Sequence, residues 1–316
     1  MNELVEQTDG GLRVLIALAT NGKAENTRKA YGRAITDYAE WVADMPIADK
    51  VRVGGFTRSS LLMYVRFLQD AGMSATSINQ RLAALRSLAK ELKYQGTIDE
   101  KVANGIADVE NVPDRGRHVG HWLTQDEARN LLDTPDSETL KGRQERVMLA
   151  LLLGVGLRRS EAADLTWEHI QETGGHHFVK NIVGKHGRRR TVPIPPWAVS
   201  LLLNWQDETE DTGPVLRAVN KGGKLAGPVK TKNNGMTDGG MSSQAVYKQV
   251  RLLAARAGIE DLAPHSLRKT YALRLYKQGC PLDQISLFLG HQDLATTEIY
   301  LGLKDVDMDD PFMVEY

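Results

Sequence analysis

Two segments of the chain place an arginine or a lysine where it could contact a phosphate. Arg158, in GLRRSE, stands at a turn into a helix, and a helix N-terminus favours anions because its backbone N–H groups are free. Lys185 stands between two β-rich stretches and precedes Arg188, Arg189 and Arg190, so it would occupy the tip of a basic hairpin. The alternative interpretations are an arginine that only pairs with an acid and a loop that is only solvated.

Two further segments carry imidazole and phenol groups. A helix that opens at Pro264 places His265 and Arg268 one turn apart on one face, so both can address one ligand. His291 precedes Tyr300 by nine residues, and Tyr300 lies on an amphipathic stretch. A tyrosine in that position is more often a half-buried core or interface residue, and this alternative stays open.

Other chemistries find less support. The pairs His118 with His121 and His176 with His177 lack a nearby Cys or Asp to complete a metal site, so we expect no metal. Cys280 is the only cysteine, which excludes an internal disulfide. The GVG sequence lacks the third glycine of a dinucleotide fingerprint, and no phosphate-binding P-loop is present, so we expect no cofactor.

Composition predicts a two-domain protein with a mildly basic body. A chain of 316 residues exceeds the usual size of one domain. Its formal net charge is zero, but residues 305–316 hold five acids and no base, so the other residues carry a net +5. We expect a cytoplasmic, nucleoid-associated protein, since no apolar run could span a bilayer and the acidic start lacks the pattern of a secretion signal.

The elements that must position these residues are mostly helices. In the first third, apolar periodicity predicts helices from Asn26 or Thr27, as the cap, to about Asp44, from Arg58 to Asp70, and from Ser74 to before Gly96. Proline, glycine and dense charge predict a linker within residues 107–120. We therefore expect a helical domain at 1–112, a linker at 113–120 and a second domain at 121–316.

The second domain is predicted to hold a small sheet among helices. The stretches HHFVKNIV and RRRTVPI favour a β-hairpin, and residues 217–241 favour a surface loop or an extended hairpin. The expected helices cover about 124–132, 144–153, a short segment after 158, 198–206, 242–257, 264–278, 281–289 and 294–301. The expected fold class is mainly α with a small β-sheet: an N-terminal helical domain followed by an α+β domain.

Taken in this order, the segments GLRRSE, VGKHGRRRTVP, HSLRKTYA and LGHQDLATTEIY resemble the tyrosine recombinase (phage integrase) family, especially its two-domain Xer-type members. The resemblance covers residues 150–302, and the first helices are similar to the family's core-binding domain. It implies an enzyme that cleaves and rejoins DNA strands through a 3′-phosphotyrosyl intermediate. Ser266 departs from the family pattern, which more often has an acidic residue there.

The resemblance also implies a role for each matching residue. Tyr300 is the expected nucleophile, Lys185 the expected general acid, and Glu161 a supporting acid. The expected catalytic set is Arg158, Lys185, His265, Arg268, His291 and Tyr300. Two guanidiniums would stabilise the charge that builds on the phosphate during attack. The covalent phosphotyrosine would store the bond energy, so neither ATP nor a metal is expected to be needed.

The expected partner is double-stranded DNA. Contacts are predicted from the first domain and from the hairpin arginines, namely Thr27, Arg28, Arg81, Arg86, Arg188, Arg189 and Arg190. The resemblance implies a dimer on each site, a tetramer in synapsis, and room for a second recombinase or an accessory protein; no membrane contact is expected. The tail at residues 305–316 is either frayed or docks on a neighbouring subunit.

Two other functions are weighed against this one. A type IB-like topoisomerase shares the nucleophile and the cation cluster but relaxes DNA without joining two sites. A catalytically silent DNA-binding accessory protein would have kept the fold alone, and the intact set of chemical residues argues against it. The sequence leaves open whether the task is integration, excision or dimer resolution.

Overall fold

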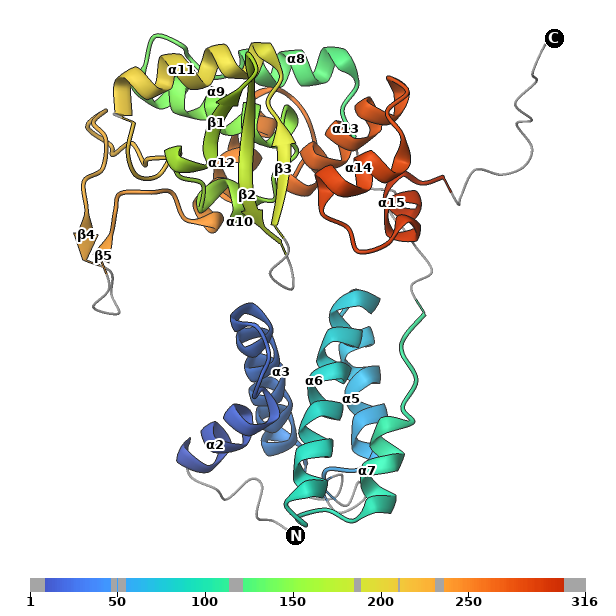
Figure 1. Cartoon of the computed structure of the whole chain (residues 1–316). Helices are drawn as coiled ribbons and strands as arrows, with labels where there is room; N and C mark the ends of the chain where they lie inside the picture. The colour runs from blue at the N-terminus through green and yellow to red at the C-terminus, as the bar shows by residue number, and fades with distance from the viewer. Residues whose placement is uncertain are drawn as a thin grey trace, which may run out of the picture. The chain divides into compact units, whose positions relative to one another are not determined.

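The computed structural model describes residues 9–46, 50, 55–113, 122–184, 189–209, 211–230 and 236–303. The chain divides into two compact units, residues 1–117 and 118–316, each with its own hydrophobic core. Within the described residues, no helix combines the length and the apolar character that crossing a membrane requires. The prediction of a mainly α fold with a small sheet is confirmed (Figure 1).

The first unit is a bundle around one central helix. Its described helices are α2 (Asp9–Ala19), α3 (Glu25–Asp44), α5 (Arg58–Asp70), α6 (Ala75–Tyr94) and α7 (Glu100–Ala107). Helix α6 packs against the other four, because its apolar residues recur every three or four positions and are buried from Ile78 to Leu92. Helix α6 begins where predicted, with Ser74 as its cap, but the predicted cap of α3 is wrong: Ala24 takes that position and makes no side-chain cap bond.

The second unit surrounds a buried helix with other helices and the sheet. Its helices are α8 (Gln125–Asp133), α9 (Leu140–Leu153), α10 (Arg159–Ala163), the 3₁₀ turn η1 (Trp167–His169), α11 (Pro196–Thr209), α12 (Ser243–Arg256), α13 (Pro264–Lys277), α14 (Leu282–Leu289) and α15 (Leu294–Leu301). Helix α9 is the centre of the core, since every residue from Val147 to Leu153 is buried. It contacts α8, α10, α11, α12 and α13.

The three-stranded antiparallel sheet has the order β1 (Ile170–Thr173), β2 (His176–Val183), β3 (Arg189–Pro193). Strands β2 and β3 form the predicted hairpin. Its register shifts between Val179 and Ile182, where Asn181 adopts a φ of 59°, so one extra residue on β2 forms a bulge. Strand β3 contacts α14, which joins the sheet to the C-terminal helices.

The segment from Arg217 to Met241 matches the extended-hairpin interpretation. It contains β4 (Val229–Lys230) paired with β5 (Met236–Thr237), and an isolated bridge joins Arg217 to Gly240. The Arg217 guanidinium also donates hydrogen bonds to the carbonyls of Thr209 and Ala226. The bridge joins the two ends of the segment, and the bond to Thr209 ties Arg217 to the end of α11.

Candidate active site

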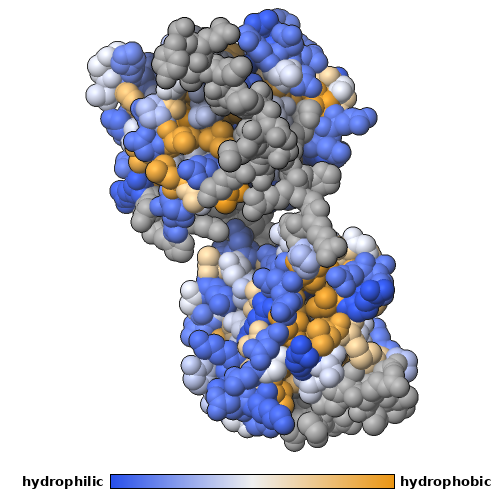
Figure 2. Space-filling model, turned by 90° about the vertical axis from the view of Figure 1, so that its right-hand side faces the viewer, coloured by the Kyte–Doolittle hydropathy of each residue, from blue (hydrophilic) through white to orange (hydrophobic). Residues whose placement is uncertain are grey.

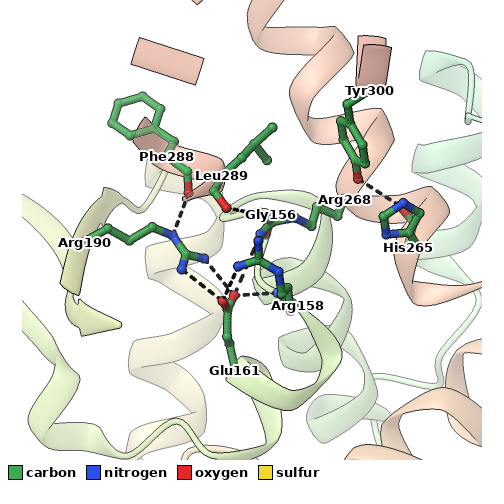
Figure 3. Close-up of polar contacts among 9 residues, drawn as sticks. All are labelled: Gly156, Arg158, Glu161, Arg190, His265, Arg268, Phe288, Leu289 and Tyr300. Atoms are coloured by element: carbon green, nitrogen blue, oxygen red, sulfur yellow. Dashed lines mark hydrogen bonds and ion pairs between the residues drawn. The ribbon is translucent and has the colours of Figure 1, made fainter. Parts of the chain in front are cut away.

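The first part of the site is the turn that leads into α10. Gly156 has a φ of 68°, and a Cβ there would lie 2.2 Å from the Tyr271 ring, so only glycine fits. Arg158 occupies the cap position of α10, where its backbone N–H donates to Glu161 Oε2 at 2.7 Å. Its guanidinium donates to Glu161 Oε1, also at 2.7 Å (Figure 3). The turn thus brings Arg158 and Glu161 together.

Arg190 on β3 reaches the same carboxylate from the other side. Its two terminal nitrogens donate to Oε1 and Oε2 of Glu161 at 2.9 and 2.7 Å, and its Nε donates to the Phe288 carbonyl at 2.8 Å. The side chain is only 4% exposed. Burial and these partners occupy the guanidinium, so this arrangement does not support the predicted contact of Arg190 with DNA. Arg190 instead links the sheet, α10 and α14.

Arg268 on α13 completes the cluster. It is 2% exposed, and its guanidinium donates to the carbonyls of Gly156 and Leu289. One nitrogen lies 3.7 Å from Glu161 Oε2. Burial, and then the positive charge of Arg158, lowers the pKa of Arg268 to about 10. Arg268 remains charged at neutral pH, and the two carbonyls and Glu161 hold its position.

Glu161 is the counter-ion shared by all three arginines. Burial alone would raise its pKa, but the hydrogen bonds and charge of Arg190, the backbone N–H of Arg158 and the charge of Arg268 outweigh burial and hold the pKa at about 2. One carboxylate therefore faces three guanidiniums. The cluster keeps a positive charge, which suits it to bind an anion.

Tyr300 projects from α15 toward this cluster. Asp293 caps the helix by accepting from the Thr296 N–H at 2.7 Å. The Tyr300 hydroxyl donates to the His265 carbonyl at 3.4 Å (Figure 3), and the side chain is half-buried. Burial raises the pKa of this hydroxyl to about 12, while the charges of Arg268 and Arg158 act in the opposite direction. The phenol is thus protonated at rest and lies within the field of the arginines.

Two imidazoles flank the Tyr300 ring edge-on. The ring centroid of His265 lies 5.1 Å from that of Tyr300, and the centroid of His291 lies 5.3 Å away. His291 Nδ1 shares a hydrogen bond of 2.9 Å with the hydroxyl of Thr297, a fully buried residue. Desolvation and the neighbouring arginines lower the pKa of both histidines, that of His291 to about 4. Both rings are therefore neutral at neutral pH.

The low histidine pKa values predict that acid weakens the fold. Between the ordinary value of 6.5 and about 4, an unfolded His291 binds a proton that the folded one does not, so stability falls as pH drops through this window. We expect urea unfolding to give a lower free energy at pH 5 than at pH 7, with a smaller difference in His291→Asn. An equal difference in both proteins would contradict this assignment.

A cavity of about 290 Å³ opens beside the cluster. Arg158, His265 and Arg268 line it, together with Arg159, Ser160, Tyr247, Ala263 and Pro264. Two of the three clustered arginines therefore face an open space large enough for a phosphodiester group. None of the eight residues that line the cavity is acidic.

The remaining predicted site residues are placed elsewhere or lie outside the described residues. Lys185 and Arg188 lie outside the described residues, as do His118, His121 and the tail at residues 305–316. Arg189 is exposed at the start of β3. Among the described residues, no three His, Cys, Asp or Glu side chains group as a metal site would require.

The predicted DNA contacts of the first unit lie on α3 and α6. Thr27 is half-buried and Arg28 is exposed. Arg81 pairs with Asp37 at 3.0 Å, and Arg86 donates to Asn111 Oδ1 at 3.0 Å and to the Val109 carbonyl. Both side chains thus have partners within the first unit.

Sequence reasoning missed two contributors to the site, Thr297 and the structural role of Arg190. Thr297 follows His291 by six residues, one helical turn into α15, and this spacing was a usable signal. Arg190 and Glu161 are 29 positions apart in the chain, so no local sequence pattern predicts that they pair.

The chain is 29% identical to tyrosine recombinase XerC of Xylella fastidiosa (strain M23), and the aligned residues cover 96% of this chain and 93% of the relative. It is also 29% identical to tyrosine recombinase XerD of Listeria monocytogenes serotype 4b (strain F2365), with 97% of each chain covered.

Solved structures agree in fold. A lambda integrase dimer bound to a COC′ core site matches with a TM-score of 0.71 and 16% identity, over all of this chain and 80% of that one. The XerH site-specific recombinase bound to difH substrate matches with a TM-score of 0.66 and 20% identity, over 98% of this chain and 85% of that one. The N-terminal SAM-like domain of phage integrases matches residues 15–96, and the phage integrase family matches residues 121–306, more than half of the chain. The chain belongs to the phage integrase family.

Proposed function

We propose that this protein is a site-specific DNA recombinase, in which Tyr300 attacks a backbone phosphate and forms a transient 3′-phosphotyrosyl bond. The observation that carries the proposal is the position of one phenol beside an arginine pair that faces an open cavity. The names of the XerC and XerD relatives support the same activity. Residues 121–316 would be the catalytic domain and residues 1–112 a DNA-binding domain, joined by a linker at 113–120.

The reaction begins with binding of the phosphate. Arg158 and Arg268 would contact its non-bridging oxygens, where they stabilise the charge that grows during attack. The Tyr300 oxygen forms a bond to phosphorus and gives up its proton. His265 is the proposed acceptor, because a lowered pKa keeps its ring neutral and able to take a proton. His291, oriented by Thr297, would donate a hydrogen bond to the phosphate.

The second half of the step breaks the bond between phosphorus and the 5′ oxygen. That oxygen leaves with the electron pair and needs a proton, for which Lys185 is the proposed donor. Rejoining reverses these events: a 5′ hydroxyl attacks the phosphotyrosine, and the Tyr300 oxygen leaves and recovers a proton. Glu161 would hold the arginines in place throughout.

We also propose that the protein acts as a dimer on each site and as a tetramer in synapsis. Exposed apolar side chains on α14 and α15 support self-association, since Leu287, Leu294 and Ile299 are 61%, 48% and 42% exposed. Figure 2 shows apolar patches on the side of the molecule where these helices lie. A second recombinase could replace one pair of subunits.

A nicked suicide substrate tests the proposed reaction. Wild-type protein is expected to form a covalent adduct with the DNA, and Tyr300→Phe is expected to form none, because phenylalanine keeps the ring but has no nucleophilic oxygen. Adduct formation by Tyr300→Phe would refute the assignment. Joining of two sites distinguishes a recombinase from a topoisomerase, which would relax supercoiled DNA without recombinant products. Binding without any adduct would indicate a silent accessory protein.

A further inference from the structure

Arg159 has an unusual environment for an exposed arginine. Its guanidinium lies over the ring of Tyr247 on α12, 5.4 Å from the ring centroid. Arg159 forms no ion pair or hydrogen bond with any described residue, and the Tyr247 hydroxyl forms no hydrogen bond with one either. A guanidinium that lies over an aromatic ring keeps its full charge, and its N–H donors are not used up by another acceptor.

The pair lies on the wall of the cavity that Arg158 and Arg268, the proposed phosphate clamp, also line. Arg159 and Tyr247 line the 290 Å³ space together with Arg158, His265 and Arg268. The acid nearest in sequence, Glu161, is buried and takes hydrogen bonds from Arg158 and Arg190. Arg159 therefore adds a guanidinium to the cavity without adding a counter-ion.

The charges of the site leave room for a second anion. Arg158, Arg159, Arg190 and Arg268 provide four positive charges, and Glu161 provides one negative charge. One bound phosphodiester would leave a surplus of two positive charges around the cavity, one of them on the exposed Arg159. A second phosphodiester would reduce that surplus.

Arg158 and Arg159 are adjacent in the chain, but their guanidiniums have different partners. Arg158 donates to Glu161, whereas the Arg159 guanidinium lies over the Tyr247 ring. The two side chains diverge from adjacent positions and can address two successive phosphates.

We propose that Arg159 and Tyr247 form a second phosphate subsite, which binds the DNA backbone phosphate next to the scissile one on the same strand. The subsite rests on the proposed recombinase function and goes beyond it. It holds the strand at a second point, so the scissile phosphate cannot rotate or slide away from Arg158 and Arg268. Arg159 is thus a positioning residue for cleavage.

A scan with neutral linkages tests the subsite. Suicide substrates would carry one methylphosphonate at each position on both sides of the scissile phosphate, and the Kd and the rate of adduct formation would be measured for each. At one position adjacent to the scissile phosphate, we expect the neutral linkage to weaken binding by the wild type by roughly 10- to 100-fold, as expected for a charge-assisted hydrogen bond.

Arg159→Ala should bind unmodified DNA as weakly as the wild type binds that one modified substrate, and it should lose sensitivity at that position alone. Its plot of log Kd against log salt should also be shallower by about 0.9, the contribution of one phosphate contact. Tyr247→Phe keeps the stacking ring and should retain the sensitivity at this position, whereas Tyr247→Leu should reduce it.

Arg251→Ala is the matched control, because Arg251 lies on α12, the helix of Tyr247, but does not line the cavity. It should keep the wild-type pattern. An Arg159→Ala pattern equal to that of the wild type at every position would overturn the subsite, as would sensitivity to removal of a base instead of to the neutral linkage. Absence of any adduct with wild-type protein would instead refute the proposed function.

Discussion

Replacement of Arg268 with alanine is expected to lower the rate of adduct formation by about 10³- to 10⁵-fold, the effect seen when other phosphoryl-transfer sites lose an arginine. The reason is that Arg268 is buried, remains charged and faces the cavity. Arg268→Lys should also be strongly impaired, because an ammonium cannot reproduce the planar fork that donates to the carbonyls of Gly156 and Leu289. Single-turnover cleavage of a suicide substrate measures both rates.

DNA binding separates chemistry from folding in these variants. Most contacts with the DNA backbone are predicted to come from other residues, so the Kd for the DNA site should change far less than the cleavage rate. A circular dichroism melt would show whether the second unit remains folded. Cleavage by a folded Arg268→Ala within tenfold of the wild-type rate would contradict the phosphate clamp.

Glu161→Gln is expected to destabilise the second unit by about 3–5 kcal/mol, the cost of breaking a buried ion pair. Glutamine keeps the shape but removes the charge that faces Arg158, Arg190 and Arg268. Arg190 is the most affected, since its side chain is 4% exposed and no other described acid pairs with it. Adduct formation should fall as well, because the arginines lose the group that fixes their positions. Urea unfolding measures the first effect.

Glu145→Gln provides a matched control for this prediction. Glu145 is also a buried glutamate of the second unit, but its partners Lys141 and Arg256 lie 3.7 and 3.8 Å away and are about half exposed. Burial raises the pKa of Glu145, whereas the arginines lower that of Glu161 to about 2. The Glu145 variant should therefore lose much less stability. Equal losses in both variants would contradict the role of Glu161 as the shared counter-ion.

The helices that carry the site were predictable because their signals are local. Pro264 starts α13, so the spacing of His265 and Arg268 on one face followed from helix geometry. Asp293 likewise caps α15 at its expected start. Helix α9 begins at Leu140, four residues before the expected start. Three residues after its cap, Thr139, comes Gly142, whose missing Cβ leaves space for the Asp136 carbonyl. Because glycine is a poor helix former, its presence in the first turn weakened the sequence signal for the helix start.

Elements without a strong periodic signal escaped prediction. Helix α2 has two glycines directly after its first residue, Asp9, and α7 has only eight residues. Strand β1 is short and largely exposed, so it shows no alternation of apolar and polar residues. The ion pairs that hold the site, above all the one between Arg190 and Glu161, depend on how β3 packs against α10 and α14, and only the tertiary structure reveals them.

Identification of the residue that becomes attached to DNA tests the central claim most directly. The covalent complex formed on a suicide substrate would be digested with protease and nuclease, and the nucleotide-bearing peptide sequenced by mass spectrometry. We predict a phosphodiester on the hydroxyl of Tyr300, in the peptide that contains LATTEIY. Attachment to another tyrosine, such as Tyr247 or Tyr271, or to a serine would contradict the account.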